Sequence, residues 1–132
     1  MKWLPSYSVG DNTIDTQHAK LFECVDDFIT ACNQKKGREE IHKTLDFLAQ
    51  YIVRHFKDEE NFMLQHGYPG LAEHKKIHQD FVKYVTDFIE ETKRNEINIS
   101  SLIGMNIKLN DWLVNHIMKE DMQYGKFIQS QK

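Results

Sequence analysis

The segments His55-Phe-Lys-Asp-Glu59 and His74-Lys-Lys-Ile-His78 each place two metal-binding side chains four residues apart. In an α-helix, residues at positions i and i+4 lie one above the other on the same face, so each pair can present two donor atoms to one point. The short stretch between the segments contains two glycines and a proline, which favour a turn. The two segments therefore predict two antiparallel helices that face a common metal site.

Both pairs lie on the apolar faces of their helices. The first helix of this pair is expected to begin near Arg38, and its apolar residues recur at spacings of three and four: Ile41, Leu45, Leu48, Ile52 and Phe62. A glutamate in a protein core is rare unless it is paired or bound to metal, because an uncompensated buried charge is costly. Metal binding is therefore the favoured interpretation of Glu59.

The next helix is expected from about Leu71 to Thr92. It places His74 and His78 on one face together with Phe81, Val85 and Phe88. If both histidines were buried without a metal ion, several ring nitrogens would need other hydrogen-bond partners.

Two further helices are expected on either side of this pair. The first runs from about Asp15 to Asn33 and places His18 on an apolar stripe, although a single inward histidine is more often an ordinary core residue than a ligand. The last begins after a helix cap at Asn98-Ile-Ser100-Ser101, carries His116, and is expected to end near Gly125.

Helices of about 20 residues joined by short connections predict an all-α fold, an up-down-up-down antiparallel four-helix bundle. Residues 1 to about 14 have no helical period and predict an extended N-terminal arm. The arm is expected to pack across one end of the bundle because it carries several apolar side chains: Trp3, Leu4, Tyr7 and Val9. Residues 1–132 are interpreted as one domain, without a strand pattern, an internal repeat or a linker.

The composition is that of a globular domain. The 132 residues are 40% apolar and 28% charged, with a formal net charge of −3. Scattered lysines and arginines favour neither nucleic acid nor an anionic membrane as a partner. No apolar run is long enough to span a membrane, and the N-terminus lacks the apolar stretch of a signal peptide. A cytoplasmic location is the simplest expectation.

The two cysteines, Cys24 and Cys32, are expected to be free thiols. They lie eight residues apart in one predicted helix, a separation of roughly 12 Å, whereas a disulfide needs Cα atoms within about 7 Å. Small apolar core residues are the favoured interpretation over a redox pair. Thiolate ligation of a metal is not expected, because no C-x-x-C motif or close Cys/His pairing is present.

Two other histidines do not join the predicted site. Glu39-Glu-Ile-His42 has the Glu-x-x-His spacing of ferritin-like di-iron bundles, but those sites need two copies and the chain has one. His42 and His66 are therefore interpreted as solvated surface residues.

The four helices together supply five imidazoles and two carboxylates to one inner face. Its members are His18, His55, Glu59, His74, His78, His116 and an acid shortly after His116. These are too many donors for one ion of ordinary coordination number, so two ions are implied. Nitrogen and oxygen donors without thiolate suit iron, with zinc or manganese as alternatives. A carboxylate that reaches both ions can bridge them.

This pattern resembles the hemerythrin family, specifically its single-domain bacterial branch. The resemblance covers nearly the whole chain, and the spacings match throughout. The residues that carry it are Trp3, Tyr7-Ser-Val-Gly10, Asp15-Thr-Gln-His18, His55-Phe-Lys-Asp-Glu59-Glu60, Tyr68-Pro69, His74-x-x-x-His78, Trp112-Leu-Val-Asn-His116 and Asp121.

The resemblance implies a pair of iron ions with a bridging oxo or hydroxo group. One iron would be held by three histidines, His74, His78 and His116, and the other by two, His18 and His55. Two carboxylates, Glu59 and Asp121, would bridge them. The iron with two histidines is then left with one open position, and in this family the ligand that binds there is dioxygen.

The acid after His116 separates helix geometry from the family pattern. Regular helical spacing favours Glu120, four residues after His116, whereas the family motif points to Asp121, five residues after it. A residue at i+5 lies well round a regular helix from residue i. We therefore predict a widened helical turn between Met118 and Asp121.

The function implied by the resemblance is reversible dioxygen binding, as a carrier, store or delivery protein. An apolar pocket would protect the bound dioxygen, and its expected lining residues are Phe56, Trp112, Leu113 and Ile117, with Trp3 as a cap; ordinary bundle core is the alternative interpretation. We do not expect an enzyme, beyond a peroxidase- or oxidase-type side activity.

Other functions remain as alternatives. The first is a di-iron enzyme that consumes peroxide, nitric oxide or dioxygen with an external reductant. The second is an oxygen or redox sensor, although the chain carries no linker or coiled coil after its last helix. Iron storage is weakly supported. Besides dioxygen, the partners to consider are an electron donor or a di-iron client protein, and the sequence does not predict the oligomeric state.

Overall fold

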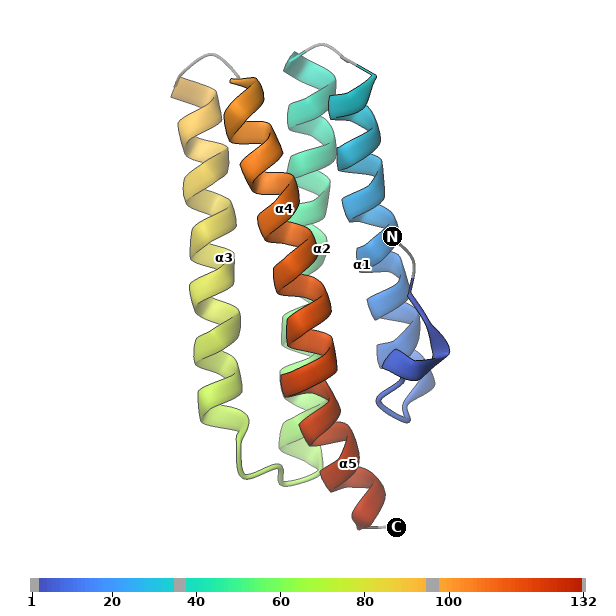
Figure 1. The fold of residues 1–132 in the computed structure, drawn as a ribbon. Coiled ribbons are helices and arrows are strands. Elements are labelled where there is room, and N and C mark those ends of the chain that lie inside the picture. The colour runs from blue at the N-terminus through green and yellow to red at the C-terminus, as the bar shows by residue number, and fades with distance from the viewer. Residues whose placement is uncertain (1–2, 35–37, 95–97, 132) are drawn as a thin grey trace.

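Four long helices form an antiparallel bundle, as predicted. The computed structural model describes residues 3–34, 38–94 and 98–131, so the first two residues of the arm and the predicted connections at 35–37 and 95–97 lie outside the described residues. The elements are η1 (Pro5–Tyr7), α1 (Asn12–Asn33), α2 (Arg38–Gln65), α3 (Leu71–Arg94), α4 (Ile99–His116), η2 (Ile117–Asp121) and α5 (Met122–Ser130). Figure 1 shows α1 and α3 running opposite to α2 and α4, with α5 continuing the direction of α4. No strand occurs among these residues.

The start of α1 differs from the prediction. The helix begins at Asn12 instead of Asp15, because the side chain of Asp11 accepts a hydrogen bond of 3.0 Å from the backbone nitrogen of Ile14. Such a cap satisfies one of the free N–H groups at a helix start. The predicted cap of α4 is confirmed, since the side chain of Asn98 accepts a bond of 2.7 Å from the nitrogen of Ser100.

The end of the last helix was predicted wrongly. Helix α5 passes through Gly125 and ends at Ser130. Gly125 is needed for close packing, because a Cβ atom there would lie 2.9 Å from the backbone oxygen of Val9 in the arm. This glycine therefore marks the place where the arm crosses the helix.

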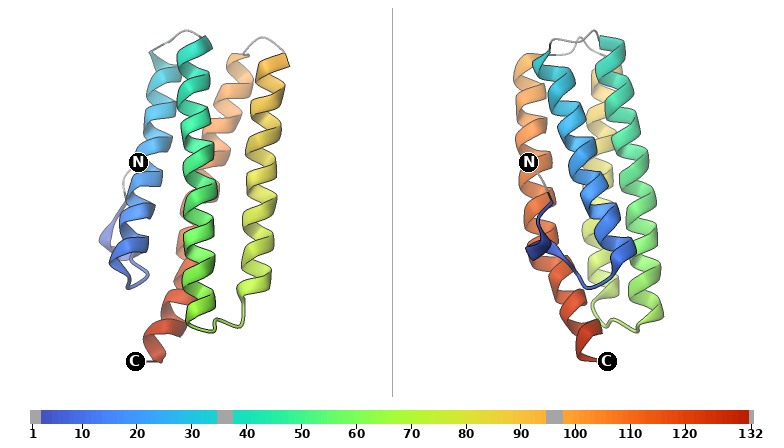
Figure 2. Two further views of the ribbon diagram at one scale, coloured as in Figure 1. Left: turned by 180° about the vertical axis from the view of Figure 1, so that it is seen from behind. Right: turned by 90° about the vertical axis from the view of Figure 1, so that its right-hand side faces the viewer.

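The arm packs against the bundle as expected, and the side chain of Asp15 on α1 binds it through two hydrogen bonds. Val9 donates a backbone hydrogen bond of 2.9 Å to Asp15, and the hydroxyl of Ser8 donates to the same carboxylate. Trp3 and Tyr7 pack against the main core. Figure 2 shows the arm lying along the end of the bundle where α1 begins.

The core consists of two apolar clusters. The main cluster fills most of the bundle and includes Phe56 on α2 and Ile117 in η2. The second is smaller and contains Val9, Ile14, Met63, Tyr124 and Ile128. Along α2 and along the last helix, the acids Glu59 and Asp121 lie between residues of these two clusters. The polar centre is therefore closed by apolar side chains on both sides.

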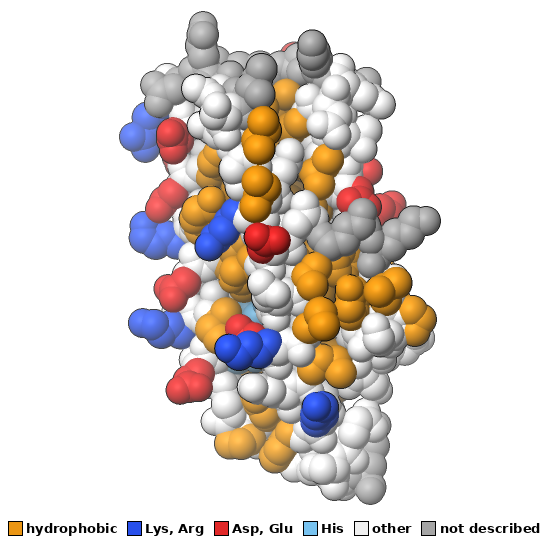
Figure 3. All heavy atoms as spheres, in the orientation of Figure 1, with side chains coloured by type: hydrophobic (Ala, Val, Ile, Leu, Met, Phe, Trp, Pro, Cys, Tyr) orange, Lys and Arg blue, Asp and Glu red, His pale blue; other side chains and the backbone are white. Residues whose placement is uncertain are grey.

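The face of the molecule drawn in Figure 3 carries both charged and apolar side chains. On the face drawn in Figure 3, hardly any histidine is visible, and side chains of both charges alternate along α3, where Lys83 pairs with Asp87 at 2.9 Å. Cys24 and Cys32 are free thiols, as predicted. Within the part of the chain that the structure describes, no helix combines the length and apolar character needed to cross a membrane.

Candidate metal centre

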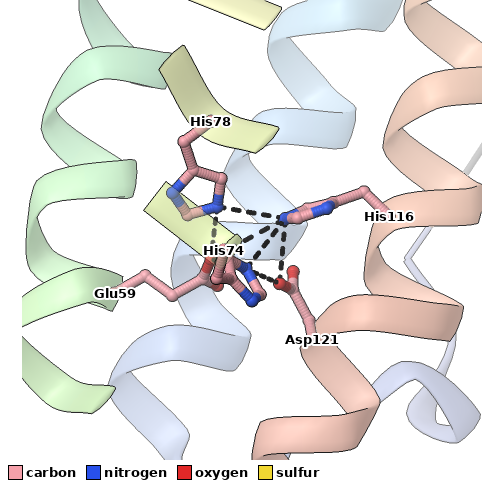
Figure 4. A group of neighbouring side chains, drawn as sticks. All are labelled: Glu59, His74, His78, His116 and Asp121. Atoms are coloured by element: carbon pink, nitrogen blue, oxygen red, sulfur yellow. Dashed lines mark hydrogen bonds and ion pairs between the residues drawn. The ribbon is translucent and has the colours of Figure 1, made fainter. Parts of the chain in front are cut away.

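All seven predicted ligands meet in one buried cluster. Donor atoms within 4.8 Å of one another come from two overlapping groups: Glu59, His74, His78, His116 and Asp121, and then His18, His55 and Glu59. Figure 4 shows the first group, whose side chains converge from α2, α3 and the last helix. Each of the seven is at most 3% exposed. We call His74, His78 and His116 the three-histidine half, and His18 and His55 the two-histidine half.

Asp121 divides its two oxygens between the halves. Its Oδ1 lies 2.9 Å from Nε2 of His74 and 3.0 Å from Nε2 of His116. Its Oδ2 lies 3.1 Å from Nε2 of His18. One carboxylate thus faces both halves.

Glu59 divides its oxygens in the same way. Its Oε1 lies 3.1 Å from Nε2 of His78 and 3.5 Å from Nε2 of His74. Its Oε2 lies 2.9 Å from Nε2 of His18 and 3.3 Å from Nε2 of His55. The arrangement fits two bridging carboxylates.

A π-helical segment, η2, brings Asp121 into the cluster. The predicted widened turn is present at Ile117–Asp121, and Asp121 is fully buried. The wider turn moves an i+5 residue onto the face of residue i. Glu120 stays outside the cluster: its Oε1 lies 3.7 Å from Nδ1 of His116, and its side chain is 24% exposed.

Charge within the cluster changes how its histidines titrate in the metal-free state. Burial alone would lower the pKa of His18, but its close contacts with Asp121 and Glu59 outweigh burial and raise the pKa to about 9. Burial is likewise outweighed at His116, where the charge of Asp121 raises the pKa to about 10. The pKa of His55 is lowered, chiefly by burial.

The two acids are held in the ionised form. Burial would raise the pKa of Glu59, but the charge of His55 and the contact with His18 lower it well below the usual range. For Asp121, burial and the charge of Glu59 would raise the pKa. The charge of His116 and the contacts with His116 and His18 outweigh them, so the pKa lies below its usual range. Two buried carboxylates therefore need positive charge at the cluster.

Several buried polar atoms fit a bound cation better than a hydrogen-bond network. No hydrogen-bond partner among the described residues satisfies Oε1 of Glu59 or either oxygen of Asp121. Nε2 of His116 faces two other Nε2 atoms, at 3.2 Å in His74 and 3.1 Å in His78. Such nitrogens can all be satisfied at once by a metal ion at their point of convergence, and the N/O donor set suits iron.

Comparison with known proteins agrees with this geometry. The family model described as the Hemerythrin HHE cation binding domain matches residues 9–128. The chain belongs to the hemerythrin family. Membership of this family implies a non-haem di-iron centre.

The chain covers most of the length of its hemerythrin relatives. It is 36% identical over 111 residues to the bacteriohemerythrin of Methylococcus capsulatus, covering 84% of this chain and 82% of that protein. It is 34% identical to the myohemerythrin of Theromyzon tessulatum, covering 93% and 89%. A crystal structure of wild-type hemerythrin has a TM-score of 0.84 and 33% identity, covering 96% of this chain and 95% of that one.

Three residues outside the predicted ligand set contact it. Nδ1 of His55 donates to Oε1 of Gln17 at 2.8 Å, and Nδ1 of His78 donates to Oε2 of Glu60 at 2.8 Å. The buried hydroxyl of Tyr124 donates to Oε2 of Glu59 at 2.8 Å. Gln17 and Glu60 lie within the motifs that carry the hemerythrin resemblance, directly beside predicted ligands, whereas Tyr124 lies outside those motifs.

Apolar side chains cover the centre toward the middle of the bundle. The ring of Phe56 stacks on His78, with centroids 3.7 Å apart, and Trp112 stacks on His116 at 4.4 Å. Three predicted pocket residues, Phe56, Trp112 and Leu113, line a narrow internal cavity; its other lining residues are Leu21, Val25, Leu48, Ile52, Phe81 and Leu109. Ile117 is fully buried in the same core but does not line this cavity, and neither does Trp3.

Two histidines predicted to be solvated are half-buried instead. His42 lies 3.5 Å from the hydroxyl of Thr92, and Nδ1 of His66 donates to the backbone oxygen of Phe62 at 2.9 Å. His42 contacts α3 through Thr92, and the ring of His66 packs against that of Phe62, with centroids 4.5 Å apart. Neither belongs to the ligand cluster.

The metal-free protein is expected to lose stability as the pH rises from about 6.5 to about 10. The folded-state pKa values of His18 and His116 lie above the ordinary 6.5, so their contribution is complete below pH 6.5 and disappears through about 9 and 10. Thermal melts of chelator-treated protein across this range measure the effect. A His66→Gln control should keep the same decline, whereas stability that is constant or rises over this range would contradict it.

Proposed function

We propose that this protein binds dioxygen reversibly at a pair of iron ions held by the seven buried ligands. The observation that carries the proposal is the division of both carboxylates, Glu59 and Asp121, between a three-histidine half and a two-histidine half. The division supports two adjacent ions that differ in their number of protein ligands.

Counting donor atoms supports an open position on one ion. The three-histidine half offers three nitrogens plus Oε1 of Glu59 and Oδ1 of Asp121, which makes five donors. The two-histidine half offers two nitrogens plus Oε2 of Glu59 and Oδ2 of Asp121, which makes four. A shared oxo or hydroxo group would add one donor to each, leaving the second ion one short of about six, the usual octahedral number.

The chemistry that the iron pair supplies when bound is the reversible binding of dioxygen. The chain contributes the apolar wall, in which Phe56, Trp112 and Leu113 line the cavity beside the centre. Such a wall excludes water and stray protons that would otherwise promote irreversible oxidation. We propose that the predicted residues Phe56, Trp112, Leu113 and Ile117 protect the dioxygen site together.

A binding role is favoured over an enzyme because no acidic side chain among the described residues lines the cavity, so none is placed there to donate a proton to bound dioxygen. The cavity is lined by apolar side chains alone. Tyr124, whose hydroxyl reaches the centre, already donates to Glu59. Burial, with the charges of Glu59 and Asp121, raises the pKa of Tyr124 well above 10, so its phenol holds its proton at neutral pH.

The test is a cycle of dioxygen exposure and removal. Iron-loaded protein is reduced without air, dioxygen is admitted, and the visible absorption is followed while the gas is purged and readmitted. The proposal expects a band that appears with dioxygen, disappears on purging and returns over several cycles. A single conversion to an unreactive oxidised form, with turnover when reductant is added, would support the enzyme alternative.

Replacing Phe56 by alanine is expected to accelerate irreversible oxidation of the loaded protein by an order of magnitude. Phe56 lines both the internal cavity and a solvent-open groove between α2 and α3, so its ring separates the two. Loss of a buried phenylalanine should also lower stability by about 3–5 kcal/mol. The oxidation rate is read from the decay of the absorption band in air.

The matched control is Phe47→Ala on the same helix, because the side chain of Phe47 is 53% exposed. It should leave both the oxidation rate and the melting temperature close to those of the unmodified protein. Equal oxidation rates in the two variants would show that Phe56 does not shield the centre.

A further inference from the structure

We propose that the two halves bind their ions with unequal affinity, that the three-histidine half fills first, and that Glu60 and Gln17 set the difference. Both residues contact a ligand histidine on the ring nitrogen that points away from the centre. They are positioning residues, and their proposed action rests on the di-iron centre of the proposed function.

Glu60 supports the three-histidine half through His78. The hydrogen bond of 2.8 Å from Nδ1 of His78 to a carboxylate oxygen requires the proton to be on Nδ1, which leaves Nε2 free to bind a metal ion. A bond to a carboxylate is charge-assisted and roughly twice as strong as one between neutral groups. The face of the same ring rests on Phe56, with the two planes 1° from parallel. His78 is therefore held in its ligand form and orientation from two sides.

Gln17 has the matching position in the two-histidine half, but it is neutral. Its amide oxygen accepts from Nδ1 of His55 at 2.8 Å, and its amide nitrogen donates to Asp58 at 2.9 Å. The contact with Asp58 fixes the orientation of the amide, so its oxygen faces His55. The amide oxygen of Gln17 therefore selects the same tautomer in His55 as Glu60 selects in His78, but it is uncharged and forms a weaker hydrogen bond.

The outer nitrogens of His116 and His18 also differ in how close a carboxylate lies to them. Nδ1 of His116, in the three-histidine half, makes no hydrogen bond among the described residues, but the carboxylate of Glu120 lies 3.7 Å away. Nδ1 of His18, in the two-histidine half, is buried and has no hydrogen-bond partner among the described residues. Within the described part of the chain, the one hydrogen bond from an outer nitrogen to a carboxylate is therefore that of His78 in the three-histidine half, and the corresponding bond in the two-histidine half goes to an amide.

Ligand number and outer contacts act in the same direction. The three-histidine half has five protein donors against four, and the bond to Glu60 makes the imidazole of His78 a stronger donor. The ion in the two-histidine half, which would have the open position, would then be the last to be gained and the first to be lost. Dioxygen-binding capacity would follow the free metal concentration through this second ion.

The test is a titration of metal-free protein with Co²⁺ under anaerobic conditions, followed by calorimetry and by visible absorption. The unmodified protein should bind two ions in sequence, the first at least tenfold more tightly. Gln17→Ala should weaken binding of the second ion by about 10- to 100-fold, as is typical when an outer hydrogen bond to a ligand is removed. The affinity for the first ion should not change. Glu60→Gln should weaken binding of the first ion by about tenfold. The difference between the two affinities would then be smaller than in the unmodified protein.

Glu23→Gln is the matched control for the change from acid to amide, since its side chain on α1 is 64% exposed. It should not alter either affinity, and circular dichroism verifies that each variant is folded. Two equal affinities in the unmodified protein, or equal weakening of both ions by Gln17→Ala, would overturn the inference.

The outcomes also separate this inference from the proposed function. Sequential Co²⁺ binding that responds to the variants as stated supports the inference even if dioxygen cycling fails. Reversible dioxygen binding in a protein whose variants leave both affinities unchanged overturns the inference alone. A protein that binds no Co²⁺ would contradict both.

Discussion

Replacing Asp121 by alanine is expected to leave fewer than one tightly bound metal ion per chain, whereas the same replacement at the adjacent Glu120 should leave two. Asp121 turns one oxygen to each half of the cluster, so its loss removes a donor from both proposed ions. Glu120 only approaches the outer nitrogen of His116, at 3.7 Å. Metal analysis of iron-reconstituted, desalted protein gives the ratio directly.

This pair of variants tests the role of the π-helical segment η2. Both changes remove one carboxylate from neighbouring positions, so they share any general effect on charge or helix propensity. If Glu120→Ala lost its metal while Asp121→Ala kept both ions, Glu120 would be the ligand, as the spacing of a regular helix favours. The assignment of Asp121 would then be wrong.

Removing the metal is expected to lower the melting temperature by more than about 10 °C. The metal-free cluster buries five histidines and two ionised acids, and no cation relieves the crowding of Nε2 atoms around His116. An ion present at about 1,000 times its dissociation constant stabilises the folded state by about 4 kcal/mol. Each kcal/mol shifts the melting temperature by a few degrees in a domain of this size.

Calorimetry of the loaded protein with and without chelator measures this shift. The Asp121→Ala variant is the control, because chelator should hardly change a melting temperature that no longer depends on two ions. An unchanged melting temperature after complete metal removal from the unmodified protein would show that the cluster is stable without a cation.

The sequence predicted which side chains meet in the buried cluster because its members lie at helical spacings on apolar faces. His55 and Glu59, and likewise His74 and His78, could be placed on one face from the i, i+4 rule alone. Asp121 could not be placed by this rule, because regular helical spacing favours its neighbour Glu120; the family motif was needed as well. The conflict between helix phase and family motif at this position predicted the widened turn that the structure contains.

Other features depend on contacts between distant segments, which spacing within one helix does not reveal. Gly125 looked like a helix end, but its missing Cβ makes room for Val9 of the arm. Gln17 contacts His55 on another helix, and Tyr124 contacts Glu59. The half-burial of His42 also depends on a neighbouring helix, through Thr92 on α3, whereas His66 bonds locally to Phe62. The start of α1 differs, because Asp11 is a local cap that the sequence could have indicated.

The most direct measurement of the central claim is dioxygen uptake by the reduced, iron-loaded protein in a closed oxygen-electrode cell. Reversible binding at one open position predicts uptake of one dioxygen for every two irons, with the same amount released when the gas above the solution is exchanged for argon. Uptake that is never released, or that continues in proportion to added reductant, would contradict reversible binding at this centre.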